Sequence, residues 1–412
     1  MEVGFLSPLF DRPGPWASVY LDTTALSPDP HPRAERAAHA ACARLRGQGA
    51  DPRTCRAVYE AMTTPAEPPA PPGRAIFATD GTVVLAPPLA TAPDGGPHAC
   101  WEALPHTGPL LELAETNPAC VVARVRPDGA TFELHGPYGV LDAGRVRGDW
   151  PVHRSSPADW SVCHFRPTEP DDDTRGAELV ADGIRNCAAR TRPELVILAG
   201  DRAVRMAVLE RLPAGLRSRT VHADERTGTA DGPPQVAGER GGTTDPIAPE
   251  VARIRATHGR RHARSTMECF LSGRLPTDDG RIAAAEGVPA LIDAARQHRI
   301  GSLIVRPEGV DLHREVWVGQ DPEQLAVRPT DAQLLGGQQP ATARADDALV
   351  RSAATSGAEV LCVRPYELAP GTPDGLPSGG LGALLRWPYG AAPETTHRRE
   401  GGGRDGGHAA RQ

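Results

Sequence analysis

The sequence predicts an α/β protein with three α/β domains in tandem. The first observation is a helix–strand–helix–strand pattern over 174–222, in which 195–199 is an unbroken apolar run. Such a run is typical of a strand that is buried on both faces of a sheet. The second observation is a pair of Asp-Gly dipeptides between strand-like segments, which predicts two β-hairpins. The third is a renewed alternation of helices and strands after residue 279.

The domain boundaries follow from these patterns. A chain of 412 residues is long enough for about two to four domains. We predict an N-terminal α/β domain over 1–115, a middle domain over 116–278 and a C-terminal α/β/α sandwich over 279–390. Residues 391–412 are rich in Gly, Arg and His, and we predict that they form a disordered tail.

The composition excludes several classes of function. Lysine is absent and all 45 basic residues are arginines, so a Schiff-base lysine, a Walker-type phosphate lysine and a kinase lysine are impossible. The eight cysteines form no Cys-x-x-Cys pair, which favours reduced thiols over disulfides or zinc. The net charge of −7 argues against wholesale nucleic-acid binding and leaves room for local basic patches. With neither a signal-like N-terminus nor an apolar run approaching membrane length, we expect a cytoplasmic protein that does not contact a membrane.

In the first domain we predict a strand at 17–22 and an alanine-rich helix at 32–46. Asp51 is the expected N-cap of a second helix, with Pro52 in its first turn. A hairpin over 75–86 follows, because Asp80-Gly81 supplies the positive φ angles of a tight turn.

The middle domain opens with a second hairpin over 120–135. Residues 138–174 are predicted to be a long polar loop, and loops of that length are usually functional or disordered. The layered 174–222 unit comes next, with Asp201 as a helix N-cap. A further loop at 224–246 leads to a helix or helix pair at 249–271.

The third domain begins with a predicted helix over 283–298. The strands that we expect after it lie at 300–305, 315–318 and 359–363, and a last element lies at 380–387. A helix over 345–356 should end at Gly357, which suits the left-handed C-terminal position.

The clearest candidate for RNA binding is an arginine run without acidic residues in the predicted helix 249–271. Its members are Arg253, Arg255, Arg260, Arg261 and Arg264. Several would share one helix face and could hold phosphates, although a solvated charged face has the same pattern. His258 and His262 have the spacing of a metal pair, but Gly259 stands where a His-Glu-x-x-His motif needs glutamate.

Arg147 and Trp150 in the long middle-domain loop form a second RNA-binding candidate. An arginine and an aromatic ring can stack on RNA bases, while Trp150 could equally pack the loop against the domain. The sequence offers no convincing catalytic triad or carboxylate pair. We therefore predict no catalytic residue, no metal and no cofactor.

Four stretches carry a resemblance to a known family. They are 15–23 (Pro-Trp-Ala-Ser-Val-Tyr-Leu-Asp-Thr), 120–135, 283–305 and 343–363. Together with the order of the domains, they resemble the bacterial members of the archaeo-eukaryotic release factor and Pelota superfamily. Among these, the chain is most similar to an actinobacterial branch that includes a ribosome hibernation factor. The resemblance covers about residues 1–390.

The resemblance implies a protein that binds the ribosome and contacts ribosomal RNA in the vacant A site. The first domain would face the decoding centre, and an RNase H-like middle domain would point toward the peptidyl-transferase centre. The third domain would be similar to a kink-turn-binding ribosomal protein. The resemblance also implies a translational GTPase, such as elongation factor Tu, as a partner. We expect a monomer.

Two departures from the family pattern bear on activity. Release factors carry Gly-Gly-Gln on a middle-domain loop, and 138–174 lacks this triplet. Gly336-Gly337-Gln338 lies in the third domain instead, where we interpret it as a turn. The Asn-Ile-Lys-Ser stop-codon motif is impossible without lysine.

We therefore expect a hibernation or stress factor without peptide-release activity. The alternative is a rescue factor that hydrolyses peptidyl-tRNA through a divergent middle-domain loop. A nuclease would need clustered carboxylates on adjacent strands, and the predicted strands 121–125 and 195–199 carry none.

Overall fold

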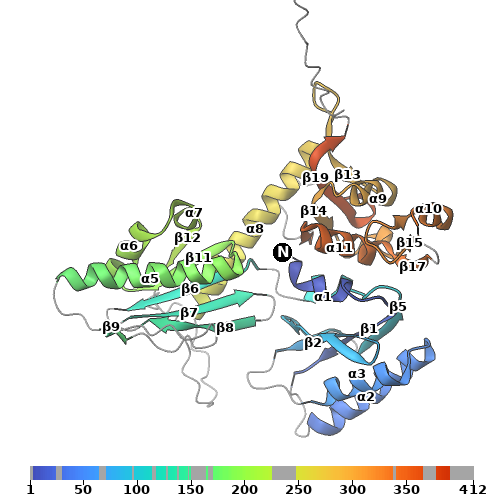
Figure 1. Ribbon diagram of the computed structural model, residues 1–412, viewed down its shortest axis with the longest axis horizontal. Helices are drawn as coiled ribbons and strands as arrows, with labels where there is room; N and C mark the ends of the chain where they lie inside the picture. The colour runs from blue at the N-terminus through green and yellow to red at the C-terminus, as the bar shows by residue number, and fades with distance from the viewer. Residues whose placement is uncertain are drawn as a thin grey trace, which may run out of the picture.

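A computed structural model shows a mixed α/β protein with three α/β units, which confirms the predicted fold class. Figure 1 shows the three units, with the middle one beside the other two. The structure describes residues 3–24, 30–64, 71–94, 97–113, 117–126, 129–136, 139–146, 148–149, 164–165, 170–224, 247–336, 340–364 and 377–389.

The first unit is an antiparallel sheet with the strand order β3-β2-β1-β5, and β4 pairs with β2. Its elements are α1 (Ser7–Phe10), β1 (Trp16–Asp22), α2 (Pro30–Gly47), α3 (Pro52–Thr63), β2 (Gly73–Thr79), β3 (Thr82–Leu85), β4 (Pro88–Leu89), β5 (His98–Glu102) and α4 (Gly108–Leu113). The predicted cap is confirmed, because the Asp51 carboxylate accepts the backbone N–H groups of Arg53 and Thr54, each at 2.9 Å. The predicted hairpin turn is confirmed by positive φ angles at Asp80 and Gly81.

The middle unit is a five-stranded sheet in the order β12-β11-β6-β7-β8. Its elements are β6 (Cys120–Arg126), β7 (Gly129–Gly136), β8 (Gly139–Val146), α5 (Pro170–Thr191), β11 (Leu195–Gly200), α6 (Arg202–Arg211), α7 (Ala214–Arg217) and β12 (Thr220–Ala223). Strand β7 is antiparallel to both of its neighbours, β6 and β8. Strand β11 is parallel to both of its neighbours, β6 and β12. This strand order and direction is that of an RNase H-like domain. Two short strands, β9 (Gly148–Asp149) and β10 (His164–Phe165), pair separately.

The third unit contains a four-stranded sheet in the order β13-β19-β14-β18 and a three-stranded sheet in the order β16-β15-β17. Its elements are β13 (Ile282–Glu286), α9 (Val288–Arg296), β14 (Ile300–Val305), β15 (Glu315–Val318), β16 (Leu325–Ala326), α10 (Pro329–Leu334), β17 (Ala341–Arg344), α11 (Ala345–Ser356), β18 (Glu359–Cys362) and β19 (Leu381–Tyr389). The predicted end of α11 is confirmed, since Gly357 is left-handed with φ 66°.

A single long helix, α8 (Ala248–Gly273), connects the middle and third units (Figure 1). Its first half contributes Val251 and Ile254 to a core with the middle sheet. Its second half contributes Met267 and Phe270 to a core with the third sheet. The region predicted as one helix or two is thus one continuous helix that belongs to two cores.

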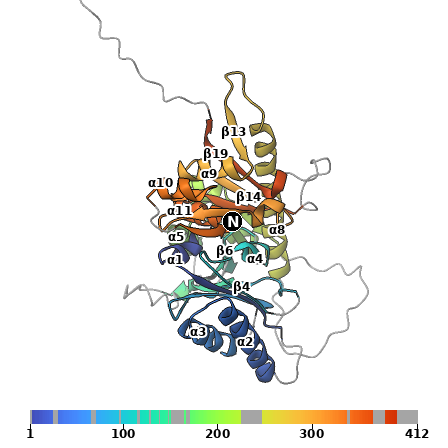
Figure 2. The ribbon, with the colours of Figure 1, turned by 90° about the vertical axis from the view of Figure 1, so that its right-hand side faces the viewer.

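The first and third units share one hydrophobic core. Trp16, Tyr20 and Phe77 of the first sheet lie in the same buried cluster as Leu291 of α9 and Leu349 of α11. Figure 2 shows the third unit directly above the first sheet. The alternate residues of β1 pack against α2 and α3 instead, so this strand is buried on both faces.

Two predicted elements are wrong. The loop predicted for 138–174 begins with β8, a strand that pairs with β7, and α5 begins at Pro170. The helix predicted for 283–298 begins with β13, and α9 starts only at Val288. Alanine and glutamate favour a helix in isolation, but pairing with β19 overrides that propensity in β13.

Within the part of the chain that the structure describes, no helix is long and apolar enough to cross a bilayer. The tail at 391–412 and most of the loop at 224–246 lie outside the described residues.

Candidate nucleic-acid interface

Three arginines of the predicted run are exposed in the central part of α8. Arg260, Arg261 and Arg264 stand between the stretch that packs on the middle sheet and the stretch that packs on the third sheet. Because residues three and four apart are neighbours on a helix, these guanidinium groups lie on one face. They form a compact positive patch, which we call the helix patch.

The other two arginines of the run have different roles. Arg255 is 4% exposed and donates two hydrogen bonds to the Pro118 carbonyl oxygen, each at 3.3 Å. Its assignment as an RNA contact is therefore wrong in this structure, because its guanidinium group is buried. Arg253 is exposed but pairs with Glu250 one turn earlier, at 2.8 and 2.5 Å. That carboxylate neutralises much of its charge.

The two histidines of α8 do not form a metal pair. The His262 Nε2 atom lies 2.7 Å from a Glu359 carboxylate oxygen, which ties α8 to β18. The Glu359 hydrogen bond raises the pKa of His262. Burial and then the neighbouring His262 lower the pKa of His258. The histidines thus have opposite electrostatic surroundings, and His262 is used in a contact between units.

Two further predicted features fall partly or wholly outside the described residues. Arg147 and Trp150 both lie there. Of the Gly-Gly-Gln triplet, only Gly336 is described. It follows α10 in the third unit with φ +93°, and its N–H donates to the Gln333 carbonyl oxygen at 3.0 Å. Gly336 thus occupies a turn, as the sequence predicted.

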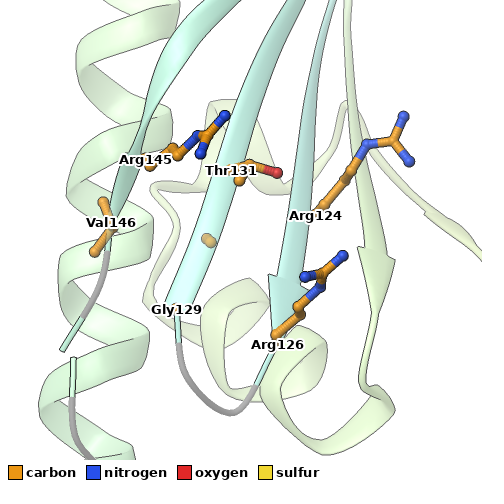
Figure 3. A pocket seen from close by; sticks show the side chains of 7 residues that line it. Arg124, Arg126, Gly129, Thr131, Arg145 and Val146 are labelled. Carbon is orange, nitrogen blue, oxygen red and sulfur yellow. The ribbon is translucent and has the colours of Figure 1, made fainter. Parts of the chain in front are cut away.

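The structure adds a second basic site, on the middle sheet. Figure 3 shows Arg124, Arg126 and Arg145 around a cavity of about 280 Å³ at the ends of β6, β7 and β8. Arg124 and Arg126 are on β6 and Arg145 is on β8, with Thr131 of β7 between them. We call this cavity the sheet pocket.

Sequence reasoning missed the sheet pocket because its arginines do not form a run. The available signal was the Arg-x-Arg spacing at 124 and 126, which places both side chains on one face of a strand. Arg145 could not be added, because 139–146 was interpreted as a loop. Only the pairing of β7 with β8 brings it opposite Thr131.

A buried charged cluster lies between the first and third units. Asp347, at the start of α11, accepts hydrogen bonds from the Thr107 N–H at 2.7 Å and the Thr107 hydroxyl at 3.1 Å. Its other oxygen is 2.9 Å from Nδ1 of His106. Arg344 donates two hydrogen bonds to Asp346, at 3.0 and 2.6 Å. Although Glu102, His106 and Asp347 are close enough to surround a metal ion, Asp347 is already hydrogen-bonded through both oxygens, so the cluster fits an interface contact better.

The middle unit matches a known protein family. Residues 119–274 match the model of bacterial archaeo-eukaryotic release factor family 2. This segment contains the whole middle sheet together with α8. Over these residues the chain is similar to a release factor family, and the resemblance to that superfamily is confirmed.

Relatives match along most of the chain. The protein is 26% identical over 389 residues to the uncharacterized protein Rv2629 of Mycobacterium tuberculosis (strain ATCC 25618 / H37Rv), covering 91% of this chain and 94% of the relative. Ribosome-bound archaeal Pelota, in a structure together with ABCE1, is similar over 93% of this chain and 94% of its own, with 16% identity and a TM-score of 0.37. The archaeal translation termination factor aRF1 is similar over 93% and 96%, with 15% identity and a TM-score of 0.22.

Proposed function

We propose that this protein binds the ribosome as a release-factor-like factor, occupies the vacant A site and keeps idle ribosomes inactive or protected under stress. The observation that carries the proposal is the match of residues 119–274 to a release factor family. The helix patch and the sheet pocket support it, because ribosomal RNA presents closely spaced phosphates that arginine binds well. The protein would act in the cytoplasm.

Binding would be local and electrostatic. The chain carries a net charge of −7, so its overall charge does not attract RNA and the arginine clusters would select the docking orientation. The helix patch lies between two units, where it could contact RNA while the rest of α8 stays packed. A translational GTPase such as elongation factor Tu is the second partner that we propose, from the resemblance seen in the sequence.

We propose that the factor has no peptide-release activity. The Gly-Gly-Gln triplet is in the third unit and begins in a turn after α10. The runner-up remains a rescue factor that hydrolyses peptidyl-tRNA through a divergent loop in 138–174. That stretch contains β8. In the sequence Arg147 directly follows β8, and Trp150 directly follows the short strand β9.

A nuclease is the least supported function. Glu133 of β7 and Asp142 of β8 are direct cross-strand neighbours, as two metal-binding carboxylates would be. However, Glu133 pairs with Arg124 and with His135, and the Asp142 carboxylate accepts the Gly144 N–H at 2.9 Å. Both carboxylates are therefore used in contacts within the sheet.

Sedimentation with ribosomes tests the proposal. Tagged protein from stationary-phase cells should migrate with ribosomal fractions in a low-salt sucrose gradient and dissociate as the salt concentration rises. Replacing Arg260, Arg261 and Arg264 together by glutamine should lower the ribosome-bound fraction several-fold. The matched control is Arg253→Gln, because this arginine on the same helix is already paired with Glu250.

Absence of the wild-type protein from ribosomal fractions at low salt would refute the proposal. A peptide-release assay on a stalled ribosome distinguishes the alternative. We expect no release above background. Release that is lost on Gly337→Ala substitution would establish the rescue enzyme instead.

A further inference from the structure

One face of the middle sheet is only partly covered by helices. Cys120 and Val122 of β6 lie in the core formed with α8. Successive residues of a strand alternate between faces, so Arg124 and Arg126 continue the same face toward the end of β6. There Arg126 is exposed and Arg124 is half-buried. The other face packs against α5 through Val121, Ala123 and Val125, among other residues.

The strand register aligns the pocket residues in a row. Arg124 pairs with Thr131, and Thr131 pairs with Arg145. Side chains that are paired across neighbouring strands point to the same face, about 5 Å apart at their Cβ atoms. Figure 3 shows the three arginines and Thr131 on one side of the sheet. Gly129 also lines the cavity, and because it has no side chain it leaves this end open.

Arg124 is held in place before any ligand arrives. Its Nε and Nη2 atoms donate to the two carboxylate oxygens of Glu133, at 3.1 and 3.2 Å. The His135 hydrogen bond, followed by Arg124, holds the pKa of Glu133 at about 2, so this carboxylate is ionised at neutral pH. A pre-positioned guanidinium group loses little side-chain entropy on binding.

Arg126 and Arg145 supply the unneutralised charge. Both are exposed, and neither has an ion pair or hydrogen bond with any residue that the structure describes. Their separation along the chain means that folding alone brings them together. The pocket therefore combines a hydroxyl donor with one fixed guanidinium group and two that have no acidic partner among the described residues.

We propose that the sheet pocket binds a phosphate group of an RNA backbone. The inference rests on the proposed ribosome-binding function, and it names the sheet pocket as one place where the protein contacts RNA. The cavity is slightly smaller than the ~300–1,000 Å³ of typical small-molecule sites. Among the described residues, the side chains that line it include no aromatic ring on which a base could stack. Both features favour a backbone phosphate, which is bound independently of sequence, over a free nucleotide.

Binding of a short RNA to the full-length protein tests this assignment. The probe is a fluorescent ten-nucleotide single-stranded RNA, titrated at several salt concentrations. Arg126→Gln/Arg145→Gln should weaken binding by roughly tenfold, since two exposed ion pairs contribute about 1.4 kcal/mol together. The slope of log affinity against log salt should fall by at least about 0.7, the share of one phosphate on a single strand.

The matched control is Arg190→Gln/Arg202→Gln. It removes the same charge from exposed positions of α5 and α6, which pack on the opposite face of the sheet, and should bind RNA like the wild type. Equal loss in both double variants would overturn the proposal, because it would indicate a net-charge effect. Unchanged binding in the pocket variant would overturn it too.

Titration with inorganic phosphate separates a backbone site from a free-anion site. We expect weak binding of phosphate, far below the affinity for RNA. Phosphate binding as tight as RNA binding would overturn the RNA assignment. This outcome is distinct from failure of the proposed function, because ribosome sedimentation does not depend on this one pocket.

Discussion

Asp347 shows how a buried charge can hold two units together. It is 1% exposed, and its oxygens meet Thr107 and His106, which are some 240 residues earlier in the chain. The Tyr20 hydroxyl donates to the His106 carbonyl oxygen at 2.6 Å, and the His106 N–H donates to the Ser18 hydroxyl at 2.9 Å. A buried carboxylate without partners would be costly, so its hydrogen bonds select one docking geometry.

The contact should be stronger at mildly acidic than at alkaline pH. Burial lowers the pKa of His106, but Asp347 outweighs that effect and raises it. Burial, followed by the Asp347 charge, raises the pKa of Asp346. Both groups therefore favour the contact between the first and third units at low pH. This stabilisation is lost as the pH rises through the pKa values that the two groups have in the folded protein. The other charged or titratable groups nearby include Glu102, Glu112, Arg344, His98 and His313.

Hydrogen exchange at the Thr107 amide measures this effect locally. After correction for the intrinsic rate, protection should be greater at pH 6 than at pH 8. His106→Gln should flatten most of the dependence, since glutamine does not titrate. Equal protection at both pH values in the wild type would contradict the expectation.

At the scale of elements, α8 depends on packing at both ends. Phe270 is fully buried near its C-terminal end, and a Cβ atom at Gly382 of β19 would come within 2.8 Å of the ring. Gly382 thus allows the helix to approach the sheet closely, for which glycine is well suited. The position of the helix patch depends on this contact.

Phe270→Ala should lower the free energy of unfolding by about 3–5 kcal/mol, through lost burial and the cavity left behind. Chemical denaturation followed by circular dichroism measures the change. Leu275→Ala is the control, because this side chain is 69% exposed and its loss should cost less than about 0.5 kcal/mol. A Phe270→Ala protein as stable as the control would show that packing of Phe270 does not contribute to the free energy of unfolding.

Elements with strong local signals could be predicted from the sequence. They include the Asp51 and Asp201 caps, the Asp80-Gly81 turn and the apolar strand β11. In each case the conformation is specified by residues within a few positions of one another. The misassigned β8 and β13 have weak local signals, and their strand conformation comes from hydrogen bonds to partner strands.

At the scale of the molecule, the first and third units behave as one body. Their shared hydrophobic cluster includes the face of β1 that carries Trp16 and Tyr20, together with the buried faces of α9 and α11. The Arg364 guanidinium group adds a hydrogen bond to the Glu112 carbonyl oxygen at 2.5 Å. The middle unit has its own core, and α8 joins it to the third unit.

Leu291→Ala in α9 should therefore loosen the first unit as well. We expect a loss of about 2–5 kcal/mol and faster hydrogen exchange in β1 and β2, although the change is in the third unit. Val208→Ala, in the separate core of the middle unit, should leave exchange in β1 unchanged. Hydrogen exchange with mass spectrometry compares the two variants. Unaltered β1 protection in Leu291→Ala would show that the units open independently.

The α/β class, most of the elements and the release-factor resemblance could be predicted from the sequence, because periodicity, caps and turn residues act over short distances. Tertiary contacts set which arginines reach solvent, since they bury Arg255 and place Arg126 and Arg145 around one cavity. It also decided that the first and third units share a core. These outcomes depend on contacts between residues far apart in the chain, whose energies no local pattern records.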